Sequence, residues 1–249
     1  MSFNVYMVSV LMEKALAVME KLTPNKTFKF KNFFYRPDMK FALELLKKNS
    51  FRPSVVVDVG AYKGEWAMLC KRVFPEANVL MVEPSPARVQ FLDILCQRHK
   101  GLSVRQALVG AEEEKVFFNE QETNSSAVPK PLSNTIELTS KTLDALVKNT
   151  SFASPDLIKL DVQGYEFRVL KGMPQALRSV SVIVIELSLI QLSPYAPSFK
   201  DAVEWMDENG FKIFDICGFF RRPLDDALWQ IDAVFVRKDS GFGDRTKGW

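Results

Sequence analysis

The sequence predicts a doubly wound, Rossmann-like α/β fold, and two observations carry this prediction. Short runs rich in Val, Ile and Leu occur at residues 55–59, 79–82, 157–160 and 182–187, and they are continuously apolar rather than alternating. Such runs are typical of strands in a parallel sheet that is covered on both faces. Stretches long enough for crossover helices follow the first two runs, and this alternation indicates a doubly wound domain.

The elements of the first half follow in order. Residues 38–49 predict a helix with one apolar face, and residues 63–74 and 86–98 are the two crossover helices. Residues 103–109 form a weaker third strand. Residues 119–135 are polar and contain two prolines, so we expect either disorder or a functional lid there.

The end of the chain breaks the alternation. Residues 211–217 and 230–236 both read as strands, and the segment between them has no helical periodicity, which favours an antiparallel pair. The prediction is a mostly parallel seven-stranded sheet with an antiparallel last strand and helices on both faces. Class I methyltransferases have this Rossmann-like arrangement.

Composition limits the kind of partner and compartment. The formal net charge is +3 with no long basic run, so nucleic acid is not expected as a partner. Cys70, Cys96 and Cys217 are an odd number and widely spaced. They argue against a disulfide framework or a structural zinc site and for the reducing cytoplasm.

The N-terminus resembles neither a signal peptide nor a membrane span. Its first twelve residues lack a basic start, are interrupted by Glu13 and Lys14, and are too short to cross a bilayer. We expect an amphipathic helix over residues 5–21 that packs on the domain or on a second subunit, which would make a homo-oligomer. Loose membrane association is the alternative.

A glycine-containing turn follows the first predicted strand. Asp58 and Gly60 end that strand, and Gly64 starts the next helix. Ligands of open α/β sheets bind at the carboxyl ends of strands, and Gly60 lets the backbone approach a ligand. The helix N-terminus favours an anionic group such as a carboxylate. A plain strand-to-helix turn is the alternative interpretation.

Glu83 ends the second strand and strengthens the prediction of a nucleoside site. An acid at this position can accept both ribose hydroxyls of a bound nucleoside. Dinucleotide-binding domains place an acid similarly, but they use GxGxxG to approach a pyrophosphate. Here Lys63 stands at the third position after Gly60, so the loop suits a cofactor without a pyrophosphate.

Further acidic residues follow the later strands. Asp161 ends a strand in the middle of the sheet, Gly164 allows close approach, and Glu166 starts the next helix. Glu186 ends the following strand. Glu166 either stabilises the helix dipole or belongs to the site. A buried Asp161 without a partner would be costly, which favours a functional role.

The chain resembles the FkbM-type methyltransferases over residues 55–236. The resemblance rests on the segments DVGAYKGEWA, VEPSP, KTLD, IKLDVQGYEFRVLKG, VIVIELS and WQIDAVFV. The usual form of the fourth segment has DVEG, whereas this chain carries Gln163 in place of the acid. That difference removes a charge near the expected site.

The resemblance implies methylation dependent on S-adenosylmethionine (SAM), usually of an oxygen on a sugar, polyketide or other secondary metabolite. The acceptor is therefore expected to be a small molecule or a glycan. The domains would be a helical extension at 1–52, a SAM-binding domain at 53–239 and a tail at 240–249. By motif match, the cofactor-binding residues would be Asp58, Gly60, Tyr62, Gly64, Glu83, Pro84 and Asp161.

Methylation of a hydroxyl requires removal of its proton, so a base is expected near the acceptor. The lone His99 falls late in a helix, away from the site, which leaves Asp161 or Glu186, or alternatively Lys159, as the catalytic group. No metal site is predicted, because Asp161, Glu166 and Glu186 match no recognised spacing of metal ligands.

Three functions remain open from the sequence. The first is an O-methyltransferase, and the second is a nicotinamide-dependent oxidoreductase, which the absent GxGxxG disfavours. The third is a non-catalytic SAM-binding or partner-binding protein, which Gln163 favours. Arg221 and Arg222, between the last two strands, lie either in a solvated turn or against an anionic acceptor. Phe219 and Trp229 are expected in the core.

Overall fold

A computed structural model of the chain describes residues 38–119, 125–128, 130, 135–190 and 195–242. The chain divides into two compact units, residues 1–37 and 38–249. The helix predicted over residues 5–21, and the subunit contact expected from it, lie outside the described residues. The three domain boundaries expected from the sequence stay predictions. None of the described helices is long and apolar enough to cross a membrane.

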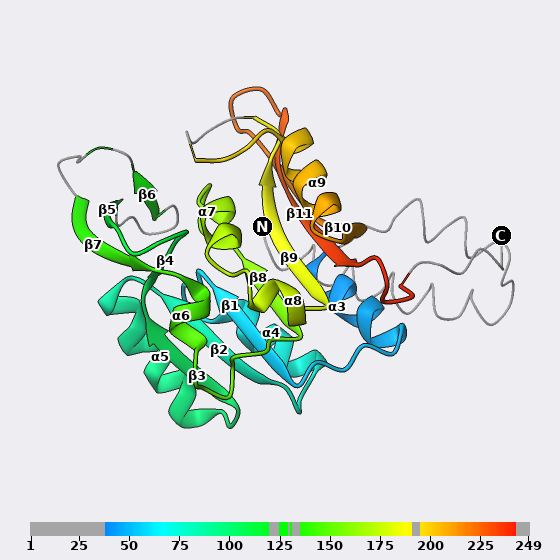
Figure 1. The fold of residues 1–249 in the computed structure, drawn as a ribbon, viewed down its shortest axis with the longest axis horizontal. Coiled ribbons are helices and arrows are strands. Elements are labelled where there is room, and N and C mark those ends of the chain that lie inside the picture. Colours follow the sequence, from blue (N-terminus) through cyan, green and yellow to red (C-terminus); the bar gives the residue numbers. More distant parts are fainter. Residues whose placement is uncertain (1–37, 120–124, 129, 131–134, 191–194, 243–249) are drawn as a thin grey trace, which may run out of the picture. The chain divides into compact units, whose positions relative to one another are not determined.

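Seven strands form the main sheet in the order β10-β11-β9-β8-β1-β2-β3 (Figure 1). Strands β8 and β2 flank β1 in parallel, and the parallel set continues to β9 and β3. Strand β11 runs antiparallel to both β9 and β10. The predicted sheet, with its antiparallel last strand, is confirmed. The strands are β1 (Val55–Val59), β2 (Asn78–Glu83), β3 (Leu102–Gln106), β8 (Leu157–Leu160), β9 (Val182–Ser188), β10 (Phe211–Arg221) and β11 (Leu228–Arg237).

Helices cover both faces of this sheet, as predicted. One face packs on α6 (Leu143–Val147), α7 (Glu166–Lys171), α8 (Ala176–Ser179) and α9 (Phe199–Glu208). The other face packs on α3 (Met39–Lys48), α4 (Glu65–Val73) and α5 (Pro86–Arg98). Side chains alternate between the faces of a strand, so the apolar runs supply both cores at once.

A second sheet of four strands, in the order β4-β7-β5-β6, lies between β3 and α6 in the sequence. It consists of β4 (Leu108–Val109), β5 (Lys115–Asn119), β6 (Ser126–Val128) and β7 (Thr135–Lys141). The expectation of an irregular segment at 119–135 is therefore wrong for residues 126–128. These residues pair with β5, and three residues are too few to show a period of two.

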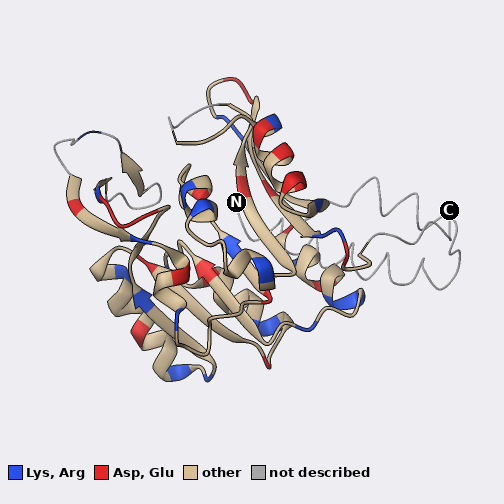
Figure 2. Ribbon diagram, in the orientation of Figure 1, with Lys and Arg blue, Asp and Glu red and all other residues tan. Residues whose placement is uncertain are grey.

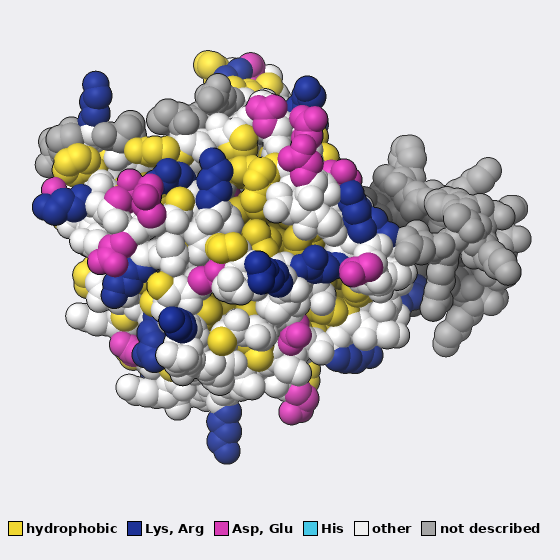
Figure 3. All heavy atoms as spheres, in the orientation of Figure 1, with side chains coloured by type: hydrophobic (Ala, Val, Ile, Leu, Met, Phe, Trp, Pro, Cys, Tyr) yellow, Lys and Arg dark blue, Asp and Glu magenta, His cyan; other side chains and the backbone are white. Residues whose placement is uncertain are grey.

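Charges of both signs are spread over the surface helices, and α9 carries mostly acidic ones (Figure 2). In the space-filling view, hydrophobic side chains emerge between these charged groups near the middle of the face shown (Figure 3). The carboxyl ends of β1, β2, β8 and β9 meet at one edge of the main sheet, because these strands are parallel. The acidic residues predicted from the sequence lie at that edge.

Candidate active site

The loop from β1 to α4 links three strands at this edge. The backbone amide of Gly60 donates to the carbonyl of Val82 at 2.9 Å. Gly60 has a φ of +82°, and a Cβ there would lie 1.9 Å from the carbonyl oxygen of Asp161. Only glycine fits, because both the dihedral angle and the close approach exclude a side chain. Gly60 therefore lets the loops after β1 and β8 touch.

Glu83 ends β2 with its side chain buried. Its carboxylate accepts hydrogen bonds from the backbone amides of Tyr62 at 3.0 Å and Ser85 at 3.1 Å, and it pairs with Arg88 at 3.3 Å. Burial raises the pKa of Glu83, while the two amides and Arg88 oppose this rise. The carboxylate is thus fixed at the position where a ribose would meet the sheet.

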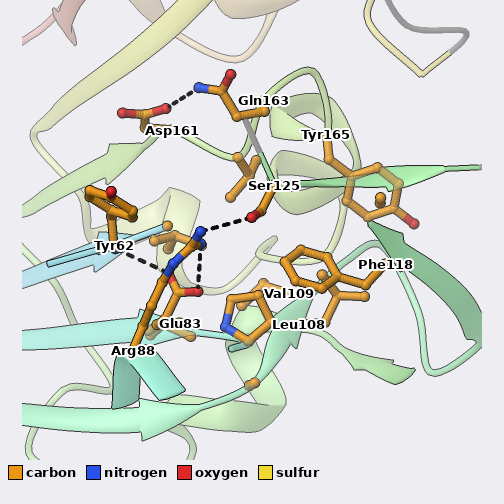
Figure 4. Close-up of a pocket in the computed structure, with 17 residues that line it drawn as sticks. Tyr62, Glu83, Arg88, Leu108, Val109, Phe118, Ser125, Asp161, Gln163 and Tyr165 are labelled. Atoms are coloured by element: carbon orange, nitrogen blue, oxygen red, sulfur yellow. Dashed lines mark hydrogen bonds and ion pairs between the residues drawn. The ribbon is translucent and has the colours of Figure 1, made fainter. Parts of the chain in front are cut away.

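A cavity of about 150 Å³ opens between Gly60, Glu83 and Asp161. Figure 4 shows Arg88 crossing it, bonded to Glu83 and, at 2.9 Å, to the hydroxyl of Ser125. The Arg88 guanidinium also lies over the ring of Tyr62, 4.7 Å from its centre. Small-molecule sites usually exceed roughly 300 Å³, and the Arg88 side chain occupies part of this space (Figure 4). Apolar walls come from Leu108, Val109 and Phe118, and the remaining polar lining includes Gln163 and Tyr165.

This lining fits SAM by its chemistry. A buried carboxylate suits the ribose hydroxyls, apolar side chains suit the adenine, and the glycine turn leaves room for the methionyl part. Pro84, directly after Glu83, also lines the cavity. Asp58 and Gly64 line neither this cavity nor the second one described below. Gly64 instead caps the start of α4 in the left-handed conformation.

Asp161 stands directly after β8 and is held by two donors. Lys159 donates to it at 3.0 Å and the side-chain amide of Gln163 at 2.9 Å. Burial would raise the pKa of Asp161, but Lys159 and Gln163 outweigh burial and lower it. Asp161 is therefore ionised at neutral pH, a condition for accepting a proton.

Glu186 lies near the end of β9, and its protonation state is opposite to that of Asp161. Gln163 donates to its carboxyl at 3.3 Å and Gln230 at 2.9 Å. Burial, followed by the negative charge of Asp161, raises the pKa of Glu186 to about 9. Glu186 therefore carries a proton at neutral pH. Gln163, in the left-handed region at φ 55°, joins the two carboxyl groups where the resemblance predicts a third acid.

Glu166 begins α7 and turns back on its own loop. Its carboxyl accepts hydrogen bonds from the backbone amides of Val162 at 3.0 Å and Gly164 at 3.1 Å. Burial raises its pKa to about 7. The sequence left open whether Glu166 stabilises the start of its helix or belongs to the site. These bonds to its own loop support the role at the helix start. In the part of the chain that the structure describes, no group of three or more His, Cys, Asp or Glu side chains is arranged to hold a metal ion.

Asp58 and Lys159 form a buried pair beneath the site. Asp58 is fully buried, and its carboxylate lies 3.6 Å from the ammonium of Lys159. Burial raises the pKa of Asp58, which Lys159 opposes. Burial would lower the pKa of Lys159, but Asp161 and Asp58 raise it above its usual range. Lys159 stays charged and cannot act as a base at neutral pH.

A second cavity, of about 450 Å³, adjoins the first. The two share Gly60, Tyr62 and Asp161, so Asp161 faces both. Apolar side chains from three elements wall the second cavity: Met39 of α3, Trp66 and Leu69 of α4, and Phe220 of β10. Besides Asp161 and Tyr62, its polar lining consists of Glu65, Arg72, Lys159, Glu186 and Asp232.

Several predicted candidates lie elsewhere. His99 caps the end of α5 and lines neither cavity. Arg222 pairs with Asp225 within the β10–β11 turn. The expectation that Phe219 belongs to the core is wrong, since it is 45% exposed on the edge strand β10.

Comparison with known proteins identifies the family. The methyltransferase FkbM domain matches residues 58–213. These residues include the loops after β1 and β8, which line the cavities. The chain belongs to the FkbM methyltransferase family. This membership confirms the predicted family and its cofactor, SAM, and it excludes the nicotinamide-dependent oxidoreductase.

Two methyltransferases are similar to this chain in sequence. The FkbM chain is 30% identical over 149 residues to the hexuronic acid methyltransferase AglP of Haloferax volcanii, covering 58% of this chain and 60% of AglP. It is 21% identical over 234 residues to methyltransferase 1 of Beauveria bassiana, covering 80% and 91%.

Solved structures show similar chains at low identity. The magnesium protoporphyrin IX methyltransferase of Synechocystis PCC 6803 is 12% identical with a TM-score of 0.49, and the match covers 80% of this chain and 78% of that one. A putative O-methyltransferase from Klebsiella pneumoniae gives the same identity, score and shares.

Sequence reasoning missed several cavity residues of this FkbM protein. Leu108 and Val109 follow the third strand of the sheet, and the rule that ligands bind beyond strand ends could have identified them. Ser125 and Asp232 carried no such signal. Ser125 reaches the cavity through a second sheet, and Asp232 lies within an antiparallel strand, where the rule does not apply.

Proposed function

We propose that this protein transfers a methyl group from SAM to a hydroxyl group of a sugar. One observation carries the proposal: the ionised carboxylate of Asp161 lines both the cofactor-type cavity and the adjoining cavity. A group in that position can meet a methyl donor on one side and an acceptor on the other. The similarity to AglP, named as a hexuronic acid methyltransferase, supports a sugar as the acceptor class.

For the cofactor, we assign the ribose hydroxyls to Glu83 and the adenine to the apolar wall at Leu108 and Val109. Gly60, Tyr62, Pro84 and Asp161 would contact the rest, and all of them line the first cavity. Asp58 would act indirectly by holding Lys159, and Gly64 by starting α4. When bound, SAM supplies an electrophilic methyl group: the bond to the acceptor oxygen forms as the methyl–sulfur bond breaks, and that bond's electrons stay on sulfur.

Two carboxyl groups of this chain act on the acceptor hydroxyl. Asp161, ionised and held by Lys159, accepts the proton that the acceptor hydroxyl loses. Glu186, protonated at neutral pH, donates a hydrogen bond that orients the acceptor. Two carboxyl groups with oppositely shifted pKa values are typical of a site that divides acid and base roles.

Asp161→Asn tests this assignment, with Asp207→Asn on the exposed side of α9 as the control. We expect turnover to fall roughly 10²- to 10⁴-fold, the usual effect of losing a general base, while SAM affinity from calorimetry changes only a few-fold. A lower melting temperature with normal specific activity would instead indicate a structural role. SAM binding by the wild type without methyl transfer to any sugar would favour the non-catalytic alternative.

The location of the protein remains part of this proposal. Cys70, Cys96 and Cys217 are all free thiols, which supports the reducing cytoplasm.

A further inference from the structure

The second cavity combines an apolar wall with an unsatisfied donor. Trp66 is 8% exposed, and its indole N–H has no hydrogen-bond partner among the described residues. A buried donor without a partner is costly unless a ligand satisfies it. Trp66 and Phe220 are also the kind of flat side chain on which sugar rings pack. The cavity therefore suits a ligand that brings oxygen acceptors and apolar ring faces.

The buried cation of this cavity, Lys159, is already paired with carboxylates. Lys159 has a side chain only 8% exposed, and it lies 3.0 Å from Asp161 and 3.6 Å from Asp58. Its single charge thus faces two carboxylates. Arg72, the other cation in the lining, is exposed, and the exposed Glu65 of the same helix also lines the cavity. Lys159, the cation beside Asp161, therefore offers no uncompensated charge to an anion bound there.

The Asp232 carboxylate, in contrast, has no ion-pair partner of its own among the described residues. Asp232 of β11 lies directly opposite Glu186 of β9 in the sheet, and neither forms an ion pair within the described part of the chain. Gly218 faces Asp232 on the other side, and a Cβ there would lie 2.3 Å from the Asp232 carboxylate. The glycine leaves space for that carboxylate.

The negative charge of Asp161 raises the pKa values of both Asp232 and Glu186. Burial, and then Asp161, raises the pKa of Asp232 to about 6 and that of Glu186 to about 9. Asp232 therefore stays mostly ionised at neutral pH, while Glu186 becomes a neutral donor. A carboxylate on the acceptor would meet the same repulsion from Asp161 and Asp232.

The arginines at the tip of the β10–β11 hairpin do not offset this repulsion. Arg222 pairs with Asp225 at 2.5 Å, and Arg221 donates to the backbone carbonyl of Asp226 at 2.8 Å. Neither residue lines the second cavity. The interpretation that they bind an anionic acceptor has no support from this geometry.

We propose that the acceptor is an uncharged sugar and that Asp161 and Asp232 exclude sugars bearing a carboxylate. The proposal rests on the proposed function and narrows its substrate class from sugars in general to sugars without an acid group. Hydroxyl groups of such a sugar can accept from Glu186 and donate to Asp161 and Asp232. A uronic acid would add a third carboxylate beside those of Asp161 and Asp232, which is repulsive in a partly desolvated cavity.

The test compares matched pairs of methyl glycosides, each a neutral hexoside and the corresponding hexuronide in the gluco, galacto and manno series. The full chain is supplied with SAM, and kcat/KM is measured from release of S-adenosylhomocysteine. We expect the neutral member of at least one pair to be preferred by roughly 100-fold, since juxtaposed like charges cost several kcal/mol. Asp232→Asn, which preserves shape, should reduce that preference about 10-fold.

Asp215→Asn is the control, because Asp215 lies on the neighbouring strand β10, is half-buried and lines neither cavity. It should leave the preference unchanged. Preference for the hexuronide by the wild type would overturn the inference while leaving the proposed function intact. The same holds if Asp232→Asn binds SAM normally but keeps the wild-type preference. SAM binding without transfer to any glycoside would overturn the proposed function, and this inference with it.

Discussion

Replacing Gln163 by glutamate would place a third carboxyl group between Asp161 and Glu186. The Gln163 amide nitrogen now lies 2.9 Å from Asp161 and 3.3 Å from Glu186. A hydrogen bond to a charged acceptor contributes about 1.5–3 kcal/mol, and one pKa unit corresponds to about 1.4 kcal/mol. Loss of the donor should therefore raise the pKa of Asp161 by about 1 to 2 units. The lower value is expected, because the Asp161 side chain is 35% exposed and water screens the new charge.

The sign of the effect follows from the role of Asp161 as a base. A higher pKa means that Asp161 remains protonated up to a higher pH, so it accepts a proton only above that pH. The acid limb of kcat/KM should move upward by about 1 pH unit, and activity should recover well above the new pKa. Direct loss of the fold would lower activity at every pH instead.

The assay is the pH profile of kcat/KM for the wild type, Gln163→Glu and Gln97→Glu. Gln97 is exposed near the end of α5 and lines neither cavity, so its variant adds the same charge without touching Asp161. An acid limb that stays at the wild-type pH in Gln163→Glu, with normal SAM affinity, would refute the inference that Gln163, together with Lys159, lowers the pKa of Asp161.

Three further predictions concern the cofactor loop and the buried pair. Glu83→Ala should weaken SAM binding by about 1.5–3 kcal/mol in calorimetry, because hydrogen bonds to a charged acceptor are lost; unchanged affinity would contradict the ribose assignment. Gly60→Ala should lower the melting temperature, because its Cβ would meet the carbonyl of Asp161 at 1.9 Å, and a wild-type value would be inconsistent with that contact. Lys159→Met should cost about 3–5 kcal/mol in chemical unfolding, since Asp58 is left buried without its cation; a loss below 1 kcal/mol, roughly that of an exposed pair, would show that the pair is not desolvated.

The sequence was most informative where one physical effect dominated. Strands β1 and β8 match their predicted bounds because both faces are covered and their apolar runs are continuous. Asp161 and Glu83 line the same cavity, as expected for residues at the carboxyl ends of parallel strands.

The remaining features depend on contacts between distant segments. Asp232 becomes part of the site only through its register with Glu186 across β9 and β11. Ser125 does so through a small sheet whose third strand is too short to show periodicity. The opposite pKa shifts of Asp161 and Glu186 could not be predicted from the sequence, because they depend on Lys159 and on burial.

If Glu83 binds the ribose of SAM as proposed, the position of Arg88 makes SAM binding an exchange of hydrogen-bond partners. The Glu83 carboxylate already accepts from Tyr62, Ser85 and Arg88, and a carboxylate offers about four lone-pair sites. Two ribose hydroxyls can therefore both bind only if the guanidinium leaves. The measured affinity for SAM then reflects the difference in free energy between the hydrogen bond of Glu83 to Arg88 and its hydrogen bonds to the ribose. Weakening the interaction of Arg88 with Glu83 should tighten SAM binding. Position 88 is therefore a better starting point than position 83 for engineering a higher affinity.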